Sequence, residues 1–358
     1  MGRGLAEMLE QSDIAHYLLS LGLVKPQVVV EEGLAIVDAS RRNSVFLAAT
    51  RGGPTYVVKQ ATPRTARTLA HEAAVLRVLA DTPGLADQVP RVVHEEPEAA
   101  RLVLRTPGNA RDWNEHQSAG RFPQTPARTL GRALGFLHRL PVDGIEDLPP
   151  GVDPMWGLSL PEPPHELLLG LSSGAQDLLA RVQSSDALCE RLGELRNAGF
   201  DGTLVHGDLR WDNCLAVAAP GSRRRTRLLL VDWELAGRGA AGFDVGTVLA
   251  EYLRLWVGSI QIVDPRNPGR LMDQAGHPLV FMRPALRAFW SAYGLANPQR
   301  PTLQRVTQLA AVRLLQTAVE RAQALATSSA HVVTLVQLAS NMLRYPDDAA
   351  LSLLGLRE

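Results

Sequence analysis

Short hydrophobic runs dominate the first third of the chain, and short apolar runs bounded by turn residues are typical of β-strands. We expect strands in the runs at residues 28–30, 34–37, 45–49, 56–58, 90–93 and 101–104. Arg51-Gly52-Gly53-Pro54 separates two of these runs and predicts a hairpin turn. Apolar residues spaced by three or four predict helices over residues 5–22 and 64–80. This part of the chain therefore reads as an antiparallel sheet with few helices.

Helical spacing dominates the remaining two thirds. We expect helices over residues 127–140, 165–182, 186–197, 281–293, 302–327 and 330–344. Another helix is predicted to start at Asp244, a residue type suited to a helix N-cap, and to reach Trp256. Two β-type runs, Cys214–Ala218 and Arg227–Val231, interrupt the helices. The second part of the chain is therefore predicted to be mostly helical.

Composition narrows the class of protein. The chain has 358 residues, enough for two lobes, and 37 basic residues balance 37 acidic ones. This balance does not indicate a dedicated nucleic-acid or membrane-surface binder. Two cysteines in such a length suit a reducing compartment. Neither a signal peptide nor a run of 18 apolar residues is found, so we expect a cytoplasmic location.

Lysine is rare in this sequence, because Lys25 and Lys59 are the only two and all other basic residues except histidines are arginines. A mutational bias towards arginine codons explains the general trend. Lys59 ends the apolar strand Tyr56-Val57-Val58-Lys59. Lysine is a compact point charge that can lie against phosphates, which makes this position a candidate for chemistry.

Three polar residues follow apolar runs at a suggestive spacing. Asp208 and Asn213 lie five positions apart, and Asp232 follows the strand Arg227–Val231. Mg²⁺ takes oxygen ligands, usually one or two carboxylates plus phosphate oxygens, and a further carboxylate can accept a hydroxyl proton. An isolated Asp-x4-Asn is also common in turns, because both residue types favour turns. The strand before Asp232 and the upstream lysine favour phosphoryl transfer.

The motifs His206-Gly207-Asp208-x4-Asn213 and apolar run-Asp232-Trp233-Glu234 resemble those of the aminoglycoside phosphotransferase and choline kinase superfamily. With the upstream elements, the resemblance covers most of the chain. It implies an α+β, bilobal, protein-kinase-like fold, with a small N-terminal lobe of antiparallel sheet plus helix and a larger, mostly helical C-terminal lobe. The hinge of that family implies lobes at residues 1–107 and 108–358. The implied cofactors are ATP (or GTP) and Mg²⁺.

The resemblance also implies roles for individual residues. Asp208 would be the catalytic base or would orient the acceptor hydroxyl, and Asn213 with Asp232 would bind the metal. His206 would support the catalytic loop structurally. Asp244 would brace the same segment without taking part in the chemistry.

Nucleotide contacts are expected from the N-terminal lobe. Lys59 would pair with Glu72 on the following helix and hold the phosphates, as in kinases. The alternative for Glu72 is an exposed helix charge. In the resembled family the phosphate-covering loop is glycine-poor, which makes Ser40, Asn43 and Ser44 candidate nucleotide contacts. A solvated turn is the alternative for these three residues.

The acceptor is predicted less sharply than the reaction. A polycationic aminoglycoside needs an acidic pocket. Between residues 234 and 300, arginines outnumber acids: Arg238, Arg254, Arg266, Arg270, Arg283, Arg287 and Arg300 stand against Glu234, Asp244, Glu251, Asp264 and Asp273. A neutral or anionic hydroxyl compound therefore fits better than a polycation. The sequence predicts a kinase for a small molecule or natural-product intermediate, and leaves the oligomeric state open.

Three alternatives remain beside this hypothesis. Some members of the resembled superfamily act in peptide natural-product biosynthesis, so the acceptor could be a Ser or Thr side chain of a precursor peptide. A nucleotide-binding pseudokinase scaffold would be expected to lack one of Lys59, Asp208, Asn213 or Asp232, and all four are present. Arg223-Arg224-Arg225 could bind nucleic acid, but a basic hairpin tip in a neutral chain is usually a solvated turn. We expect no nucleic-acid partner and no membrane.

Overall fold

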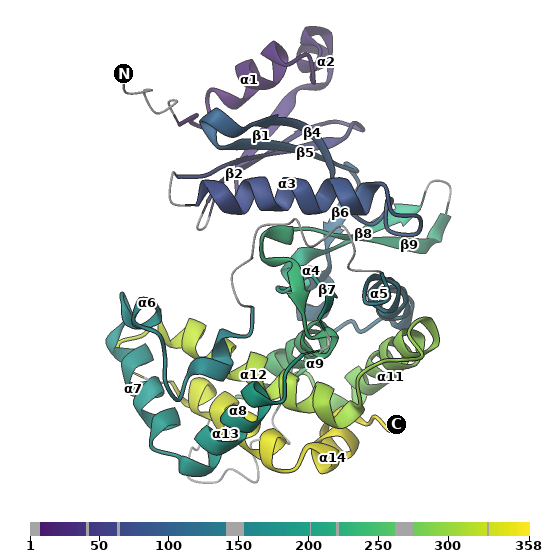
Figure 1. The fold of residues 1–358 in the computed structure, drawn as a ribbon. Coiled ribbons are helices and arrows are strands. Elements are labelled where there is room, and N and C mark those ends of the chain that lie inside the picture. Colours follow the sequence, from purple (N-terminus) through teal and green to yellow (C-terminus); the bar gives the residue numbers. More distant parts are fainter. Residues whose placement is uncertain are drawn as a thin grey trace. The chain divides into compact units, whose positions relative to one another are not determined.

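A computed structural model describes residues 8–40, 43–62, 65–140, 154–200, 202–219, 222–261, 275–327 and 329–358. The chain forms two compact units (Figure 1). The first contains residues 1–112, 146–151 and 213–236, and the second contains residues 113–145, 152–212 and 237–358. The N-terminal part is thus joined in one unit by the segment that carries Asn213 and Asp232.

A five-stranded antiparallel sheet forms the first unit, with the strand order β1-β2-β3-β5-β4. Its strands are β1 (Leu34–Asp38), β2 (Ser44–Thr50), β3 (Thr55–Gln60), β4 (Arg91–Glu96) and β5 (Arg101–Thr106). The predicted hairpin turn lies between β2 and β3, where Gly52 has a φ of 79°. Only glycine adopts this left-handed conformation without a steric penalty, which explains the glycine at position 52.

The two faces of this sheet have different partners. Side chains alternate between faces along a strand, so Phe46, Val58 and Val103, which are neighbours across β2, β3 and β5, point the same way. They pack in a hydrophobic core with residues of α1 (Ile14–Ser20). Figure 1 shows α1 and α2 (Pro26–Glu32) on one face of the sheet and α3 (Ala66–Ala80) along the other. Lys59 follows Val58 and therefore points to the α3 face.

One predicted strand is wrong. Residues 28–30 lie within α2 (Pro26–Glu32). Pro26 occupies the first helical turn, where its missing N–H costs nothing and its fixed φ favours a helix. This local start signal prevails over the strand preference of the valine run. The predicted N-terminal helix is confirmed for Ile14–Ser20, and residues 1–7 lie outside the described part of the chain.

A second sheet in the same unit has the order β6-β8-β9, from β6 (Ala110–Asp112), β8 (Cys214–Ala219) and β9 (Ser222–Leu230). β8 and β9 form an antiparallel hairpin in which Cys214 pairs with Leu230. Asn213 precedes this pair and Asp232 follows it, so the hairpin holds both at its open end. The backbone N–H of Val231 donates to the carbonyl of Asn213 at 3.0 Å. The side chains of the basic tip, Arg223 to Arg225, lie outside the described residues.

Helices build the second unit. They are α4 (Trp113–Ser118), α5 (Gln124–Leu137), α6 (His165–Leu168), α7 (Ser173–Gln183), α8 (Asp186–Asn197), α9 (Ala241–Gly258), α11 (Leu279–Ala296), α12 (Leu303–Ala322), α13 (Ala330–Arg344) and α14 (Pro346–Ala349). The pattern over residues 165–182 is split in two, because Gly170 has a φ of 84° and Ser172 caps α7 through a hydrogen bond from the N–H of Ala175. The predicted mixed α+β architecture, with an antiparallel sheet in the first unit and mostly helices in the second, is confirmed.

The predicted start of α9 is wrong by one turn. The helix begins at Ala241, after an Ala240 N-cap, so Asp244 lies inside its first turn. A two-stranded sheet of β7 (Thr203–Val205) and β10 (Gly237–Gly239) leads into this region. Among the described helices, none is long and apolar enough to cross a membrane.

Candidate active site

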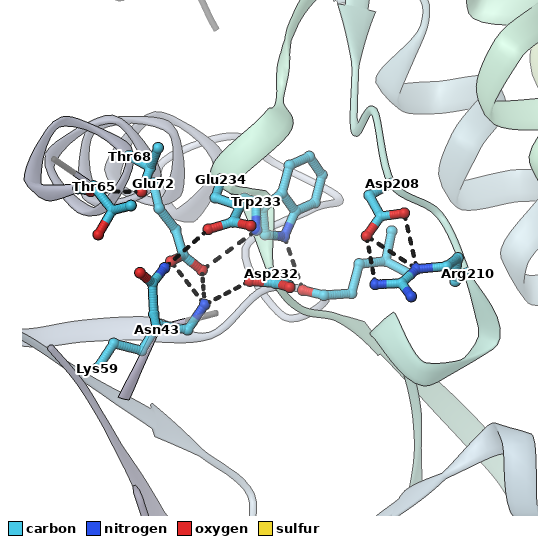
Figure 2. Close-up of polar contacts among 11 residues, drawn as sticks. Asn43, Lys59, Thr65, Thr68, Glu72, Asp208, Arg210, Asp232, Trp233 and Glu234 are labelled. Atoms are coloured by element: carbon cyan, nitrogen blue, oxygen red, sulfur yellow. Dashed lines mark hydrogen bonds and ion pairs between the residues drawn. The ribbon is translucent and has the colours of Figure 1, made fainter. Parts of the chain in front are cut away.

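Lys59 contacts two carboxylates within the first unit. Its Nζ donates to both carboxylate oxygens of Glu72 at 2.8 Å and to Oδ1 of Asp232 at 2.7 Å (Figure 2). β3 supplies Lys59 and α3 supplies Glu72, while Asp232 follows β9. The structure therefore brings together three residues that are separated by up to 173 positions in sequence.

Burial makes this arrangement electrostatically strong. Glu72 is fully buried, and burial raises the pKa of its carboxyl, an effect that Lys59 opposes and the charge of Asp232 reinforces. Burial alone would lower the pKa of Lys59, but the two carboxylates raise it well above its ordinary value. Lys59 is therefore an ammonium at neutral pH, held at a fixed point by two anions.

Asp232 has an unusual backbone conformation. Its φ of 68° and ψ of 62° place a non-glycine residue in the left-handed region, which costs about 1–3 kcal/mol unless the surroundings hold it. The next residue, Trp233, is fully buried and donates its backbone N–H to Oε1 of Glu72 at 3.3 Å. Its indole N–H donates to the carbonyl of Leu230 at 2.9 Å. Trp233 and Glu72 thus hold Asp232 in the strained conformation.

Asn213 and Asp232 fit a magnesium ion by their chemistry. The Asp232 side chain is 34% exposed and supplies a carboxylate, and Asn213 supplies an amide oxygen from the adjacent end of the hairpin. A carboxylate has about four lone-pair positions, so an ion pair with Lys59 is compatible with metal ligation. Among the described residues, no three His, Cys, Asp or Glu side chains could hold a metal by themselves. Mg²⁺ does not need such a group, because substrate phosphates usually complete its coordination.

The three candidate nucleotide contacts around the start of β2, Ser40, Asn43 and Ser44, have different hydrogen-bond partners. Nδ2 of Asn43 donates to Oε2 of Glu234 at 3.3 Å, whereas Oδ1 of Asn43 is buried without a hydrogen-bond partner in the described chain. The Ser40 hydroxyl accepts the N–H of Val45 at 3.0 Å and closes a local turn. Ser44 lies in β2 opposite Gln60. Their contact with a nucleotide stays a prediction.

The second unit carries Asp208 in a loop after β7. Asp208 forms a bidentate ion pair with Arg210, whose Nε lies 2.9 Å from Oδ1 and whose Nη2 lies 2.8 Å from Oδ2 (Figure 2). Gly207 has a φ of 82°. A side chain is strained in this conformation, which explains why glycine stands between His206 and Asp208. Nδ1 of the buried His206 accepts the backbone N–H of Asp208 at 3.3 Å.

Asp244 fixes this loop from α9. Its Oδ2 accepts the N–H of His206 at 2.7 Å, and its Oδ1 accepts the N–H of Gly207 at 2.9 Å. Nε2 of His138 lies 3.2 Å from Oδ2, and the other His138 nitrogen contacts the Tyr293 hydroxyl at 2.9 Å. Burial alone would raise the pKa of Asp244, but the hydrogen bond and charge of His138, together with His206, hold it below its ordinary value. Asp244 therefore acts as a buried anionic brace.

Sequence reasoning missed several of these partners. The sequence gives no signal for His138, which orients Asp244. His71 is buried on α3, and its Nε2 donates to the carbonyl of Ala236 at 2.6 Å, which ties the helix to the segment after Asp232. Arg210 lies inside the motif without having been singled out. Its position two residues after Asp208 was the available signal, whereas His71 and His138 depend on contacts over more than 100 positions.

Comparisons with known proteins identify the family. The model of the phosphotransferase enzyme family matches residues 34–289. Among curated protein sequences, none matches the chain. The family model covers more than half of the chain, so the protein belongs to the phosphotransferase enzyme family and is a hydroxyl-phosphorylating enzyme.

Solved structures agree in fold. An ethanolamine kinase from Plasmodium vivax is 11% identical, with 97% of this chain and 90% of that chain covered and a TM-score of 0.54. A choline/ethanolamine kinase family protein from Mesorhizobium loti is 16% identical, with 94% and 96% covered and a TM-score of 0.51. The GDP complex of aminoglycoside 2'-phosphotransferase-IIIa is 13% identical, with 93% and 99% covered and a TM-score of 0.53. At these identities the likeness supports the fold alone.

Proposed function

We propose that the protein transfers the γ-phosphoryl group of ATP, in the presence of Mg²⁺, to a hydroxyl of a small molecule or natural-product intermediate. The observation that carries the proposal is the Lys59 ammonium held between Glu72 and Asp232. A buried lysine fixed by a helix glutamate, next to an aspartate that follows a strand, is the phosphate-binding arrangement that kinases require. The family match supports the same chemistry.

Each residue has a defined part in this proposal. Lys59 binds phosphate oxygens, and Glu72 keeps its ammonium in place. Asp232 and Asn213 would hold Mg²⁺, which neutralises the charge that develops on the transferred phosphoryl group. His206 and Asp244 keep the backbone around Asp208 in one conformation. Asp208 receives or orients the hydroxyl proton, a role that requires the carboxylate to leave its ion pair with Arg210 at least in part.

ATP and the acceptor hydroxyl are the two reactants of the proposed transfer. The acceptor oxygen forms a bond to the γ-phosphorus while the bond from that phosphorus to the bridging oxygen breaks. The acceptor proton passes to Asp208, and ADP leaves. Positioning and charge neutralisation therefore supply most of the catalysis, as expected for phosphoryl transfer.

The proposal also names the nucleotide donor and the alternative acceptor. ATP is the expected donor, and GTP is the alternative, since one structure of similar fold is a GDP complex. A Ser or Thr side chain of a precursor peptide is the alternative acceptor. The names of similar structures refer to choline, ethanolamine and aminoglycosides, and their low identity does not carry those acceptors to this chain.

A mass-spectrometric screen tests the proposal directly. The protein is incubated with Mg²⁺, ATP or GTP, and pooled hydroxyl compounds, and each product is examined for the gain of one phosphoryl group. We expect at least one acceptor whose phosphorylation disappears in the Asp232→Ala variant. A nucleotide that binds without transfer to any compound or peptide would favour the pseudokinase alternative instead.

A further inference from the structure

Three arginines of the second unit lie on the loop that carries Asp208 or at α9, the helix whose Asp244 and Glu251 accept hydrogen bonds from that loop. We call Arg210, Arg254 and Arg321 the arginine cluster. Arg210 holds Asp208 directly, and the Arg254 guanidinium lies 5.8 Å from the ring centre of Trp211, the residue after Arg210. Arg321, in the last turn of α12, places its guanidinium nitrogens 3.9 Å from where a Cβ on Gly258 of α9 would lie.

The nearby carboxylates of Glu251 and Glu320 are already engaged, by Arg254 and Arg313 respectively. Glu251 pairs with Arg254, at 2.8 Å from Oε1 to Nε and 3.0 Å from Oε2 to Nη2. Glu320 pairs with Arg313 at 3.0 Å and 3.2 Å. Asp212 lies close enough to Arg210 and Arg254 to stabilise their charges. These acids balance the cluster in part, and the Glu251–Arg254 and Glu320–Arg313 pairs are both local.

Arg321 differs from the other two arginines. Within the described part of the chain it makes neither a side-chain hydrogen bond nor an ion pair. Burial lowers its pKa, and the positive charge of Arg254 lowers it further, while Glu251 and Glu320 act in the opposite direction. A half-buried guanidinium has five N–H donors, so Arg321 presents donors and positive charge at the C-terminal end of α9, one helical turn after Arg254.

A second donor lies on the same loop. Trp211 is fully buried, and its indole Nε1 has no acceptor among the described residues. The Trp211 ring packs edge-on against Tyr252 at 4.9 Å between ring centres. Buried indole N–H groups usually find a partner. Trp211, which directly follows Arg210, and Arg321 thus both carry donors that the described chain does not use.

We propose that the acceptor carries an anionic group, a carboxylate or a phosphate, which Arg321 binds with the help of the charge of Arg254 while the acceptor hydroxyl meets Asp208. This inference rests on the proposed function and names the class of its acceptor. An anion relieves the repulsion between Arg321 and Arg254 and gains charge-assisted hydrogen bonds. A cationic acceptor would meet the same charges as repulsion, which gives selectivity as well as affinity.

The test compares acceptors that share a hydroxyl but differ in charge. The probes are glycerate, glycerol and choline, then gluconate, glucose and glucosamine, and serine peptides flanked by glutamate, alanine or lysine. Apparent affinity comes from the rise in unfolding midpoint with probe concentration, which needs no catalysis. Phosphate transfer from ATP is measured separately. The small acids and the acidic peptide distinguish a free metabolite from an acidic peptide as the source of the anion.

Arg321→Gln is the decisive variant, and Arg132→Gln is its matched control, since Arg132 is an exposed arginine on α5 of the same unit. We expect the parent to prefer the anionic member of at least one set. Arg321→Gln should weaken binding of that anionic probe by about 10- to 100-fold, the value of hydrogen bonds to charged groups. Binding of Mg²⁺-ATP should stay within about twofold, and Arg132→Gln should match the parent throughout.

Several outcomes overturn the inference. One is equal binding of anionic, neutral and cationic probes, and another is an Arg321→Gln variant whose anion affinity is unchanged. A loss confined to Mg²⁺-ATP would assign Arg321 to the nucleotide instead. Phosphorylation of acceptors without regard to charge, unaffected by Arg321→Gln, would overturn the inference and leave the proposed function intact. If the protein binds anions through Arg321 but phosphorylates no compound, the anion site is supported and the proposed function is contradicted.

Discussion

The Lys59 ammonium and the Glu72 carboxylate form a bidentate ion pair, with both oxygens 2.8 Å from Nζ, in the interior of the first unit. A buried ion pair contributes little net stability, because desolvation of two charges offsets their attraction. Its value is positional, since it fixes one positive charge beside Asp232. Shape should therefore matter at this position as much as charge.

Lys59→Arg tests this point. The guanidinium keeps the charge but is planar and larger, and it cannot occupy the point between Glu72 and Asp232 that the ammonium fills. We expect turnover to fall by about 100-fold, the effect of a misplacement of about 1 Å. Steady-state kinetics with the identified acceptor measure the loss, and circular dichroism checks the fold.

Lys25→Arg provides the matched control, because Lys25 is the other lysine of the chain and is exposed at the start of α2. Its turnover should equal that of the parent. Equal turnover in Lys59→Arg and Lys25→Arg would show that Lys59 has no special role.

The sequence predicted the parts of the site that lie in short motifs. Lys59, Asp208 and Asp232 lie at or shortly after the ends of apolar runs, and the resemblance of their motifs to those of the aminoglycoside phosphotransferase and choline kinase superfamily singles them out without tertiary information. Glu72 was predictable from the helix after the Lys59 strand, and the structure contains that ion pair. The roles of these residues in catalysis stay proposals.

Other features depend on contacts that no local pattern records. His138 meets Asp244 across 106 positions, and Asp244 caps the catalytic loop instead of its own helix. Local propensity is a weak prior, and long-range packing decides such cases. The valine run at residues 28–30 differs from them, because the local signal of Pro26 starts a helix there.

Asp232→Asn tests metal binding. Asparagine tolerates the left-handed backbone of Asp232 and keeps the side-chain shape, so the fold should persist. It removes the anionic oxygen that Mg²⁺ prefers. We expect ATP with Mg²⁺ to raise the unfolding midpoint of the parent and ATP alone to raise it less, with this difference absent in the variant. A variant that keeps the full Mg²⁺-dependent rise would refute the metal assignment.

Asp244→Asn tests the brace under the catalytic loop. Asp244 accepts backbone N–H groups on both oxygens, so one of them would face an amide NH₂ in the variant. We expect a loss of about 2–4 kcal/mol of unfolding free energy at pH 7, because a buried donor loses its acceptor. Denaturant titration measures it, with the exposed Asp177→Asn as control.

The stability difference between the parent and Asp244→Asn should depend on pH. The pKa of Asp244 is lower in the folded protein than in the unfolded chain, so its stabilisation is present above the unfolded value of about 3.9 and is lost as the pH falls through the folded value. The free-energy difference between parent and Asp244→Asn should therefore shrink below about pH 4. His138 and His206 are the histidines that face the same carboxylate. A difference that stays constant from pH 7 down to pH 3 would contradict the anionic brace.

Asp208→Asn tests the catalytic carboxylate. Asparagine is nearly isosteric, but it carries no negative charge and cannot accept the acceptor proton. Assistance by a general base is typically worth about 10²–10⁴-fold, so phosphate transfer should fall by that factor, with kcat and kcat/KM falling together. Binding of Mg²⁺-ATP should stay close to that of the parent. Phosphate incorporation at saturating ATP gives the turnover, and unfolding midpoints with and without nucleotide give the binding.

A loss of turnover in Asp208→Asn could also come from the broken ion pair with Arg210, and a second variant separates the two causes. Asp208→Asn breaks a bidentate contact and could disturb the loop through Arg210 alone. Arg210→Gln breaks the same contact and leaves the carboxylate in place. If Asp208 is the base, Arg210→Gln should retain far more turnover than Asp208→Asn, because proton acceptance survives. Equal losses in the two variants would mean that the ion pair shapes the loop and that Asp208 has no separate chemical role. Turnover of Asp208→Asn within a few-fold of the parent would remove the base assignment altogether, because asparagine holds a turn as well as aspartate does.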